Sequence, residues 1–156
     1  MMRKIAGVVA CAALLCAAGA AFAAEKLPKG YEKWAKSKAR VETDKKSMFY
    51  GIHYIYVNPK AMKTYKSGTG VYPAGSEFVA VNYSIKDEGG KKVEGKKSMI
   101  VLMKKDKRQA ATGGWLFAGF SPDGKPSGLD PARDCFGCHE KEKASDYVIS
   151  KYANFK

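Results

Sequence analysis

The chain has 156 residues, which is enough for one domain with a modest hydrophobic core. It carries 28 lysine and arginine residues against 15 aspartate and glutamate residues, so its formal net charge is +13 at pH 7. Such a charge suits nucleic acid, an anionic membrane face or an acidic protein as partner. The lysines form small groups, as in Lys45-Lys46, Lys91-Lys92 and Lys104-Lys105, which is typical of a solvated surface and argues against one dedicated patch.

Residues 1–24 have the pattern of a secretory signal peptide. Arg3 and Lys4 form a positive end, an apolar run from Ile5 to Ala21 follows, and the tail matches the A-x-A cleavage pattern. An uncleaved membrane anchor and a lipoprotein with Cys11 as lipid acceptor are the alternatives. The small residues of the tail argue against the anchor, and the short apolar run before Cys11 argues against the lipoprotein.

We therefore expect one mature domain of residues 25–156 in the periplasm, with a charge of +11 because two positive residues are removed (13 − 2). Secretion argues against nucleic acid as partner. No other stretch is long and apolar enough to span a bilayer. Cys11 and Cys16 would leave with the signal peptide.

The expected elements of the mature domain follow from hydrophobic periodicity and turn residues. In chain order they begin with a helix over Lys29 to Arg40, a strand over Met48 to Val57, a helix over Pro59 to Lys66 and a strand over Ser76 to Ile85. A turn at Asp87 to Gly90, strands over Ser98 to Met103 and Trp115 to Phe120, and an irregular loop over Ser121 to Pro131 come next. The end, Asp134 to Tyr152, is expected to be helical, with a break near Ser145 as an option. This order predicts an α+β fold, a mainly antiparallel β-sheet with flanking helices.

The run Cys135-Phe136-Gly137-Cys138-His139 is the attachment sequence of a c-type haem. Thiols one helical turn apart can each bond a vinyl group on one edge of the porphyrin, and His139 can offer the iron an imidazole nitrogen. We therefore expect one covalent haem c on a C-terminal haem-binding helix. A zinc site would need four ligands, and a redox C-x-x-C belongs near a βαβ pattern, which is not visible here.

The position of the motif narrows the class of cytochrome. Small electron-transfer cytochromes c carry it near the N-terminus and use a downstream methionine as sixth ligand. Here only seventeen residues follow His139 (156 − 139), and none is methionine. The four-helix cytochromes c′ carry it near the C-terminus, but four segments with strand character make a four-helix bundle a distant second choice.

The late motif, the segment Ile52-His-Tyr-Ile-Tyr-Val-Asn-Pro59, the short helix with Tyr65 and the strand after Gly75 resemble the cytochrome P-460 superfamily. The resemblance covers nearly the whole mature chain. It implies a mainly antiparallel β-sheet haem protein that is typically a homodimer. In the P-460 branch a lysine on the strand after that glycine bonds to the porphyrin, and the enzyme oxidises hydroxylamine.

The residue at the lysine position favours the other branch, cytochrome c′-beta. Aligning Pro59 and Gly75 with the family puts Ala80 there, and we expect Lys86 to lie past the end of the strand. In the cytochrome c′-beta branch two phenylalanines cap the distal pocket, and the resemblance assigns Phe49 and Phe78 to these places. An apolar cap offers bound dioxygen no hydrogen bond and so favours nitric oxide and CO; ordinary core packing is the alternative for both rings.

His53 and Arg133 are further candidate haem contacts. If Phe49 and His53 share a strand, the period of two places both on one face. His53 could be a sixth ligand, lie near a propionate, or lie on the surface. Arg133 could pair with a propionate or with a ligand on the His139 side. For the remaining methionines, Met48, Met62, Met99 and Met103, core packing is favoured over iron ligation.

Taken together, these features predict a monohaem protein with five-coordinate, His139-ligated iron that binds nitric oxide, CO and similar gases. They favour a gas-binding haem protein over an enzyme and leave that choice open. A low-spin electron-transfer cytochrome and a hydroxylamine-oxidising enzyme remain the alternatives. Besides the gas, we expect an acidic redox protein and a second copy of the chain as partners.

Overall fold

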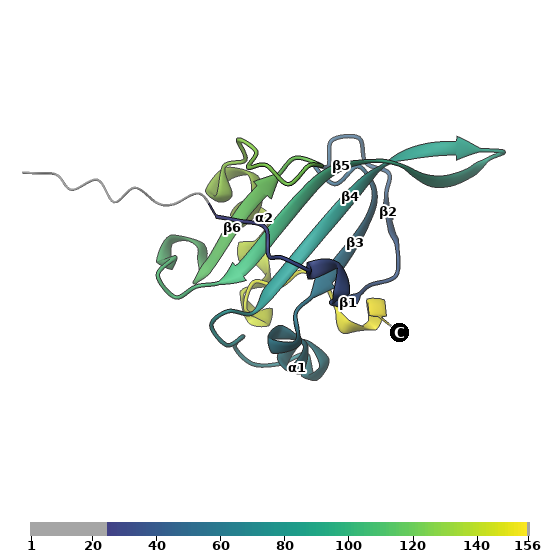
Figure 1. Ribbon diagram of the computed structural model, residues 1–156. Helices are drawn as coiled ribbons and strands as arrows, with labels where there is room; N and C mark the ends of the chain where they lie inside the picture. The colour runs from purple at the N-terminus through teal and green to yellow at the C-terminus, as the bar shows by residue number, and fades with distance from the viewer. Residues whose placement is uncertain (1–24, 156) are drawn as a thin grey trace, which may run out of the picture.

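The computed structural model describes residues 25–155, so the expected signal peptide lies outside the described residues. A six-stranded antiparallel sheet forms the body, with the order β1-β3-β4-β5-β6 and with β2 also paired to β3 (Figure 1). The strands are β1 Ala35–Lys36, β2 Arg40–Glu42, β3 Gly51–Val57, β4 Glu77–Glu88, β5 Lys91–Lys105 and β6 Trp115–Phe120. The predicted α+β class with a mainly antiparallel sheet is confirmed.

The helices are short and lie outside the sheet. The α-helices are α1 Pro59–Ser67 and α2 Gly137–His139. A π-helix, Pro131–Phe136, precedes α2, and 3-10 helices span Tyr31–Lys33, Ala110–Thr112, Glu140–Ser145 and Tyr152–Phe155. Within residues 25–155 no helix has the length and apolar character needed to cross a membrane.

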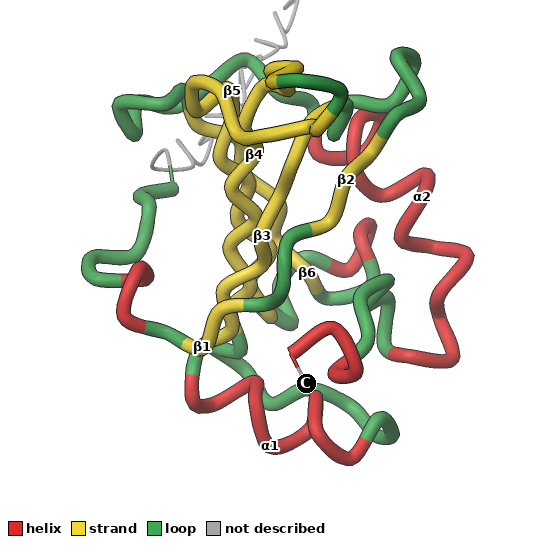
Figure 2. The backbone as a smooth tube through the Cα atoms, turned by 90° about the vertical axis from the view of Figure 1, so that its right-hand side faces the viewer, coloured by secondary structure: helices red, strands yellow, loops and turns green. Residues whose placement is uncertain are grey.

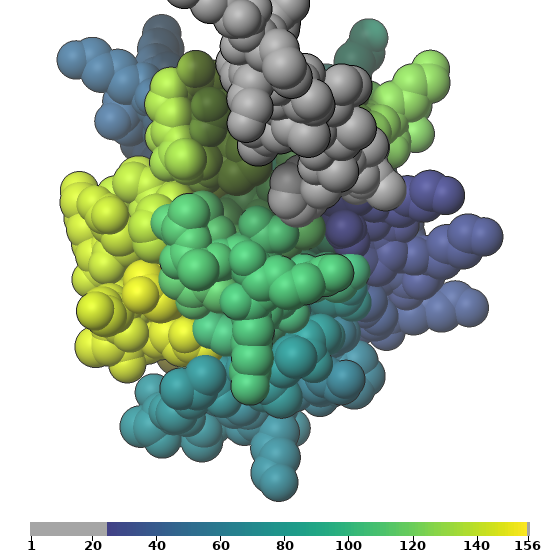
Figure 3. Space-filling model, turned by 90° about the vertical axis from the view of Figure 1, so that its left-hand side faces the viewer, coloured from purple at the N-terminus to yellow at the C-terminus, as the bar shows by residue number. Residues whose placement is uncertain are grey.

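The two faces of the sheet are covered by opposite ends of the chain (Figures 2 and 3). The N-terminal segment covers one face, where the buried residues are Tyr31, Tyr56, Val79, Val81, Ile100, Leu102 and Phe120. The C-terminal segment and α1 cover the other, where the buried residues are Val57, Ala61, Tyr65, Tyr72, Phe78, Met103, Trp115, Phe117, Cys135 and Val148. The residues of the haem motif therefore belong to the second face.

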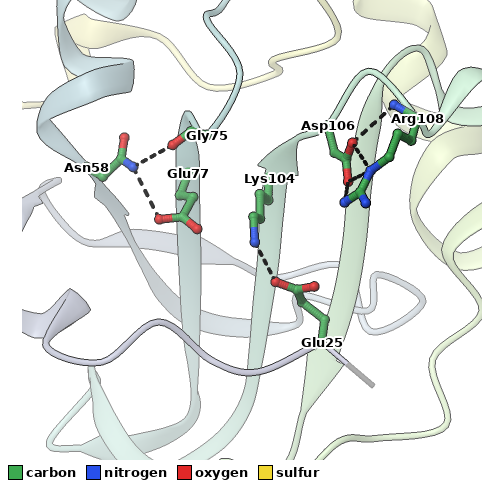
Figure 4. A network of polar contacts seen from close by, with 7 residues as sticks. All are labelled: Glu25, Asn58, Gly75, Glu77, Lys104, Asp106 and Arg108. Atoms are coloured by element: carbon green, nitrogen blue, oxygen red, sulfur yellow. Dashed lines mark hydrogen bonds and ion pairs between the residues drawn. The ribbon is translucent and has the colours of Figure 1, made fainter. Parts of the chain in front are cut away.

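Helix α1 forms where the turn residues predict it. The Asn58 side-chain oxygen accepts a hydrogen bond from the Ala61 backbone nitrogen at 2.9 Å, Pro59 occupies the first turn, and Gly68 ends the helix in the left-handed region at φ 69°. The Asn58 amide also donates to the Gly75 carbonyl and to Glu77, which ties the helix start to β4 (Figure 4).

The expected N-terminal helix is wrong except for one turn. Only Tyr31–Lys33 is helical, and the segments that follow it, β1 and β2, pair with β3. Tyr31 is 3 % exposed and packs edge-on against Tyr56, so the aromatic spacing reflects contact with the sheet. Strand pairing and ring burial override the helical periodicity of so short a segment.

Strand β3 begins later than predicted. Met48 and Phe49 lie in a turn closed by the Tyr50 backbone nitrogen, which donates to the Ser47 carbonyl at 3.0 Å. Phe49 therefore does not belong to the strand.

One further boundary is wrong, and one expected break is present. Strands β4 and β5 run on into a hairpin that projects beyond the body (Figure 1), so Lys86, expected past the strand end, lies within β4 and pairs with Val93. The C-terminal helical segment stops at Ser145 and does not reach Tyr152 as one helix, because Asp146 adopts left-handed backbone angles. The break near Ser145 is confirmed.

Gly51 allows close contact between β3 and an irregular part of β4. Its φ of 139° suits glycine, and a Cβ placed there would lie 2.2 Å from the Tyr83 carbonyl oxygen. The register of β4 against β5 shifts at Asn82 and Tyr83, next to this contact. A bulge and a glycine thus bring the two backbones together at the start of β3.

We expect Gly51→Ala to lower the free energy of unfolding by about 2 kcal/mol or more, because backbone strain and a clash act together. Gly89→Ala is the matched control, since Gly89 has a φ of 62° but open space around it. The control should cost about 1 kcal/mol. Urea unfolding measures both, and equal losses would contradict the role of the close contact.

A second prediction concerns alkaline pH. Burial raises the pKa of Tyr31 to about 12 from 10.0. The folded chain thus holds this phenol neutral where the unfolded chain ionises it, so the stability it contributes is complete below about pH 10 and is lost as the pH rises towards 12. In Tyr31→Phe the urea midpoint of unfolding should fall less steeply with pH over this range than in the wild type. An unchanged slope of midpoint against pH would contradict the prediction.

Candidate functional site

The haem motif begins on a helical segment whose N-terminus is capped by a side chain. The Asp130 carboxylate accepts hydrogen bonds from the backbone nitrogens of Ala132 and Arg133 at 2.9 and 3.0 Å, and Pro131 occupies the first turn. The chain then runs helically without a break from the π-helix into α2. This local order fixes the spacing of the motif side chains.

The two cysteines of the motif differ in exposure. Cys135 is 6 % exposed and belongs to the core under the C-terminal segment, whereas Cys138 is exposed. Burial raises the pKa of the Cys135 thiol to about 12. Both are free thiols, and their three-residue spacing on a helix places them on one side of it.

His139 is held in one orientation. Its Nδ1 lies 2.7 Å from the Tyr147 carbonyl oxygen, and because a carbonyl can only accept, Nδ1 carries the proton and Nε2 keeps its lone pair. The ring lies 4.9 Å from the ring of Phe117 on β6. Burial lowers the pKa of His139, so the neutral imidazole that a metal requires is favoured.

The sheet face beside His139 is built from three rows of cross-strand neighbours. The first row is Val57, Phe78, Met103 and Phe117; the second is Ile55, Ala80, Val101 and Gly119; the third is His53, Asn82 and Met99. The first row is fully buried, while the second and third rows contain half-buried side chains, among them Ile55, Ala80 and Met99. Most of this face is hydrocarbon.

Ala80 occupies the centre of that face, between Ile55 and Val101. According to the resemblance, the P-460 branch carries its crosslinking lysine at this position. Lys86 is exposed in the projecting hairpin, six residues further along β4. None of the residues in the three rows is lysine.

Phe49 and His53 lie together at one end of the face, although Phe49 is not on the strand. Their rings are 5.3 Å apart. His53 is half-buried, and burial, with a smaller effect from Arg40, lowers its pKa. Its Nδ1 atom is buried and has no hydrogen-bond partner among the described residues.

Phe78 lies elsewhere, in the aromatic core. It is 5 % exposed, and its ring contacts those of Tyr65, Tyr72 and Trp115. Phe78 and Asn82 are four residues apart on β4, about 13 Å, so Phe78 and the His53 end of the face lie in different rows. The structure thus places both predicted cap residues on the haem-motif side of the sheet without bringing their rings together.

The remaining candidates are less central. Arg133 is 73 % exposed and forms an ion pair with Asp134, its Nε lying 2.7 Å from Oδ1. Met103 is buried in the first row and Met99 is half-buried in the third, whereas Met48 is 40 % exposed.

No pattern in the sequence indicates the two residues, Lys105 and Asp146, that lie behind the hydrogen bond of His139. Asp146 and Lys105 form a buried ion pair at 2.6 Å, and Asp146 directly precedes Tyr147, whose carbonyl accepts the His139 hydrogen bond. These residues are far apart in the chain and fit no motif, so only their spatial contact identifies them.

The arrangement fits a haem. Two thiols on one side of a helix and an imidazole with a free Nε2 are the donor set that a c-type haem requires. The hydrocarbon rows suit the flat porphyrin ring. The buried Asn82 Oδ1 and His53 Nδ1 atoms both lack partners within residues 25–155, which suits a group with polar edges.

Comparison with known proteins agrees with this site. The family described as Cytochrome P460 matches residues 28–150, which is most of the chain and includes the whole motif. No match is found among the curated proteins. Haem and iron binding follow from the family. The chain belongs to the cytochrome P460 family.

Proposed function

We propose that this chain is a periplasmic protein with one covalent haem c and an open iron site that binds nitric oxide, and also CO. The observation that carries the proposal is Ala80 at the centre of a hydrocarbon sheet face, where the crosslinking branch of the family would need a lysine. Within this proposal, Cys135 and Cys138 hold the porphyrin edge and His139 Nε2 is the axial ligand.

When bound, the haem supplies an iron whose ferrous form takes diatomic gases. The chain itself sets the polarity of the surroundings of the iron and the access of water to it. The second-row side chains Ile55, Ala80 and Val101 present hydrocarbon and exclude water, and they offer no hydrogen bond to dioxygen or to an anion. Such surroundings favour nitric oxide and CO. Phe49 adds a ring beside His53 at one end of this face, whereas Phe78 is packed in the aromatic core.

A low-spin electron-transfer cytochrome is the second candidate, because one observation favours it. His53 lies on the same face as the gas site and has a buried nitrogen without a partner among the described residues. Iron ligation by His53 would close the site. A polar contact to a propionate would equally use that nitrogen and leave the site open.

Hydroxylamine oxidation is disfavoured on the side-chain chemistry. Lys105 lies two residues beyond Met103 of the first row on β5, and its amino group is already paired with Asp146 at 2.6 Å. An acidic redox protein remains a proposed partner, in keeping with the charge of the mature chain. A second copy of the chain remains proposed from the resemblance.

Covalent attachment is tested by cysteine substitution. We expect haem to stay with the wild-type chain in a denaturing gel and to be lost from the Cys135→Ser/Cys138→Ser variant, because no thioether can form. Cys11→Ser is the matched control, since Cys11 lies in the expected signal peptide, and it should keep its haem. Haem retained by the double variant would rule out attachment through the motif.

The open site is tested by optical spectra of the ferric and ferrous holoprotein with and without nitric oxide. We expect high-spin iron and rapid binding of nitric oxide to the ferrous form, with His53→Ala giving the same spectra. A low-spin wild type that turns high-spin in His53→Ala would favour electron transfer. A strongly red-shifted Soret band would mean that the porphyrin is crosslinked.

A further inference from the structure

We propose that Lys105 and Asp146 are positioning residues for the axial imidazole. Their buried ion pair fixes the backbone turn at Asp146 and Tyr147, and this turn presents the carbonyl oxygen that receives the His139 Nδ1 proton. The inference rests on the proposed function, in which His139 ligates the iron.

The ion pair is buried on both sides. Lys105 and Asp146 side chains are 6 % and 9 % exposed, and Lys105 Nζ lies 2.6 Å from Asp146 Oδ1. The same amino group lies 4.8 Å above the Trp115 ring. A buried ion pair adds little net stability over a well-packed apolar pair, so its use here points to fixing one geometry.

Asp146 is bound to the sheet side at three points. Besides the Lys105 contact, its Oδ2 accepts from the Tyr72 backbone nitrogen at 2.8 Å. Its backbone carbonyl accepts from Trp115 Nε1, also at 2.8 Å. The residue is thus tied to the end of β5, to the start of β6 and to the segment before β4.

The turn held by these contacts has an unfavourable backbone. Asp146 and Tyr147 have φ values of 49° and 66°, and they are the described non-glycine residues with positive φ. Aspartate tolerates this region, but a tyrosine does so at a cost. Gly113 makes room for the Tyr147 ring, since a Cβ there would lie 2.4 Å from Cε2.

The consequence for His139 follows from geometry. The Tyr147 carbonyl points at Nδ1 only while the turn keeps its left-handed form, and the three contacts of Asp146 maintain that form. A hydrogen bond from Nδ1 to a carbonyl increases the basicity of the imidazole and stabilises ferric iron. Lys105 and Asp146 therefore act on the iron through His139, without touching it.

The test uses the holoprotein and the variants Asp146→Asn and Lys105→Met. Asparagine keeps the preference for left-handed angles and one oxygen that can accept from Tyr72, but its NH2 then faces Lys105, so the charge and the acceptor for Lys105 are both lost. Lys104→Met is the matched control. Lys104 directly precedes Lys105 on β5 but pairs with Glu25, at 2.7 Å, and not with Asp146 (Figure 4). The readouts are the ferrous iron–histidine stretching frequency and the reduction potential.

We expect both variants to lower the stretching frequency and raise the reduction potential, and the control to change neither. A variant that unfolds more easily yet keeps both values would show that the pair is merely structural and would overturn the inference. If the single variants do not fold, Lys105→Met/Asp146→Asn leaves no lone buried charge. Unchanged values in that double variant would also overturn it.

The two proposals fail in different ways. A wild-type ferrous protein with no iron–histidine band contradicts the open five-coordinate site of the proposed function. The reduction potential of Lys105→Met then decides the positioning role, because removal of its positive charge would by itself lower the potential, whereas loss of the His139 hydrogen bond raises it.

Discussion

The hydrogen bond from His139 Nδ1 to the Tyr147 carbonyl oxygen is the contact on which the candidate site depends. It selects the tautomer that leaves Nε2 free and joins the haem motif to the turn that follows it. That turn is anchored by Asp146 to Lys105, Tyr72 and Trp115. The orientation of one imidazole is thereby set by residues from the sheet, and a short and irregular helical segment becomes a fixed platform.

The sheet serves two separate purposes on its two faces. The face under the N-terminal segment is closed by aromatic packing, as between Tyr31 and Tyr56. The face under the C-terminal segment is closed only in its first row, by Phe78, Met103 and Phe117. Its second and third rows keep half-buried hydrocarbon and unpartnered polar atoms, which is what a large cofactor with polar edges needs.

Membership of the family leaves the chemistry open. Alanine stands at position 80 in the centre of the face, and the amino group of the nearby Lys105 is paired with Asp146. Within the proposed function, His53 is the residue whose role separates gas binding from electron transfer. Its place beside Phe49 is compatible with either a propionate contact or ligation.

Local residue patterns were enough to predict the α+β class, strands β3 to β6 in chain order, α1 with Pro59 in its first turn and the break near Ser145, because each depends on neighbours a few residues apart. They failed for the N-terminal helix, where pairing with β3 outweighs short-range periodicity. They also failed for the start of β3, where a turn holds Phe49, and for the end of β4, which its hairpin with β5 extends. The Lys105–Asp146 pair could not be predicted at all. Forty-one residues separate its members, and a buried charge is recognised only when folding brings its partner within contact.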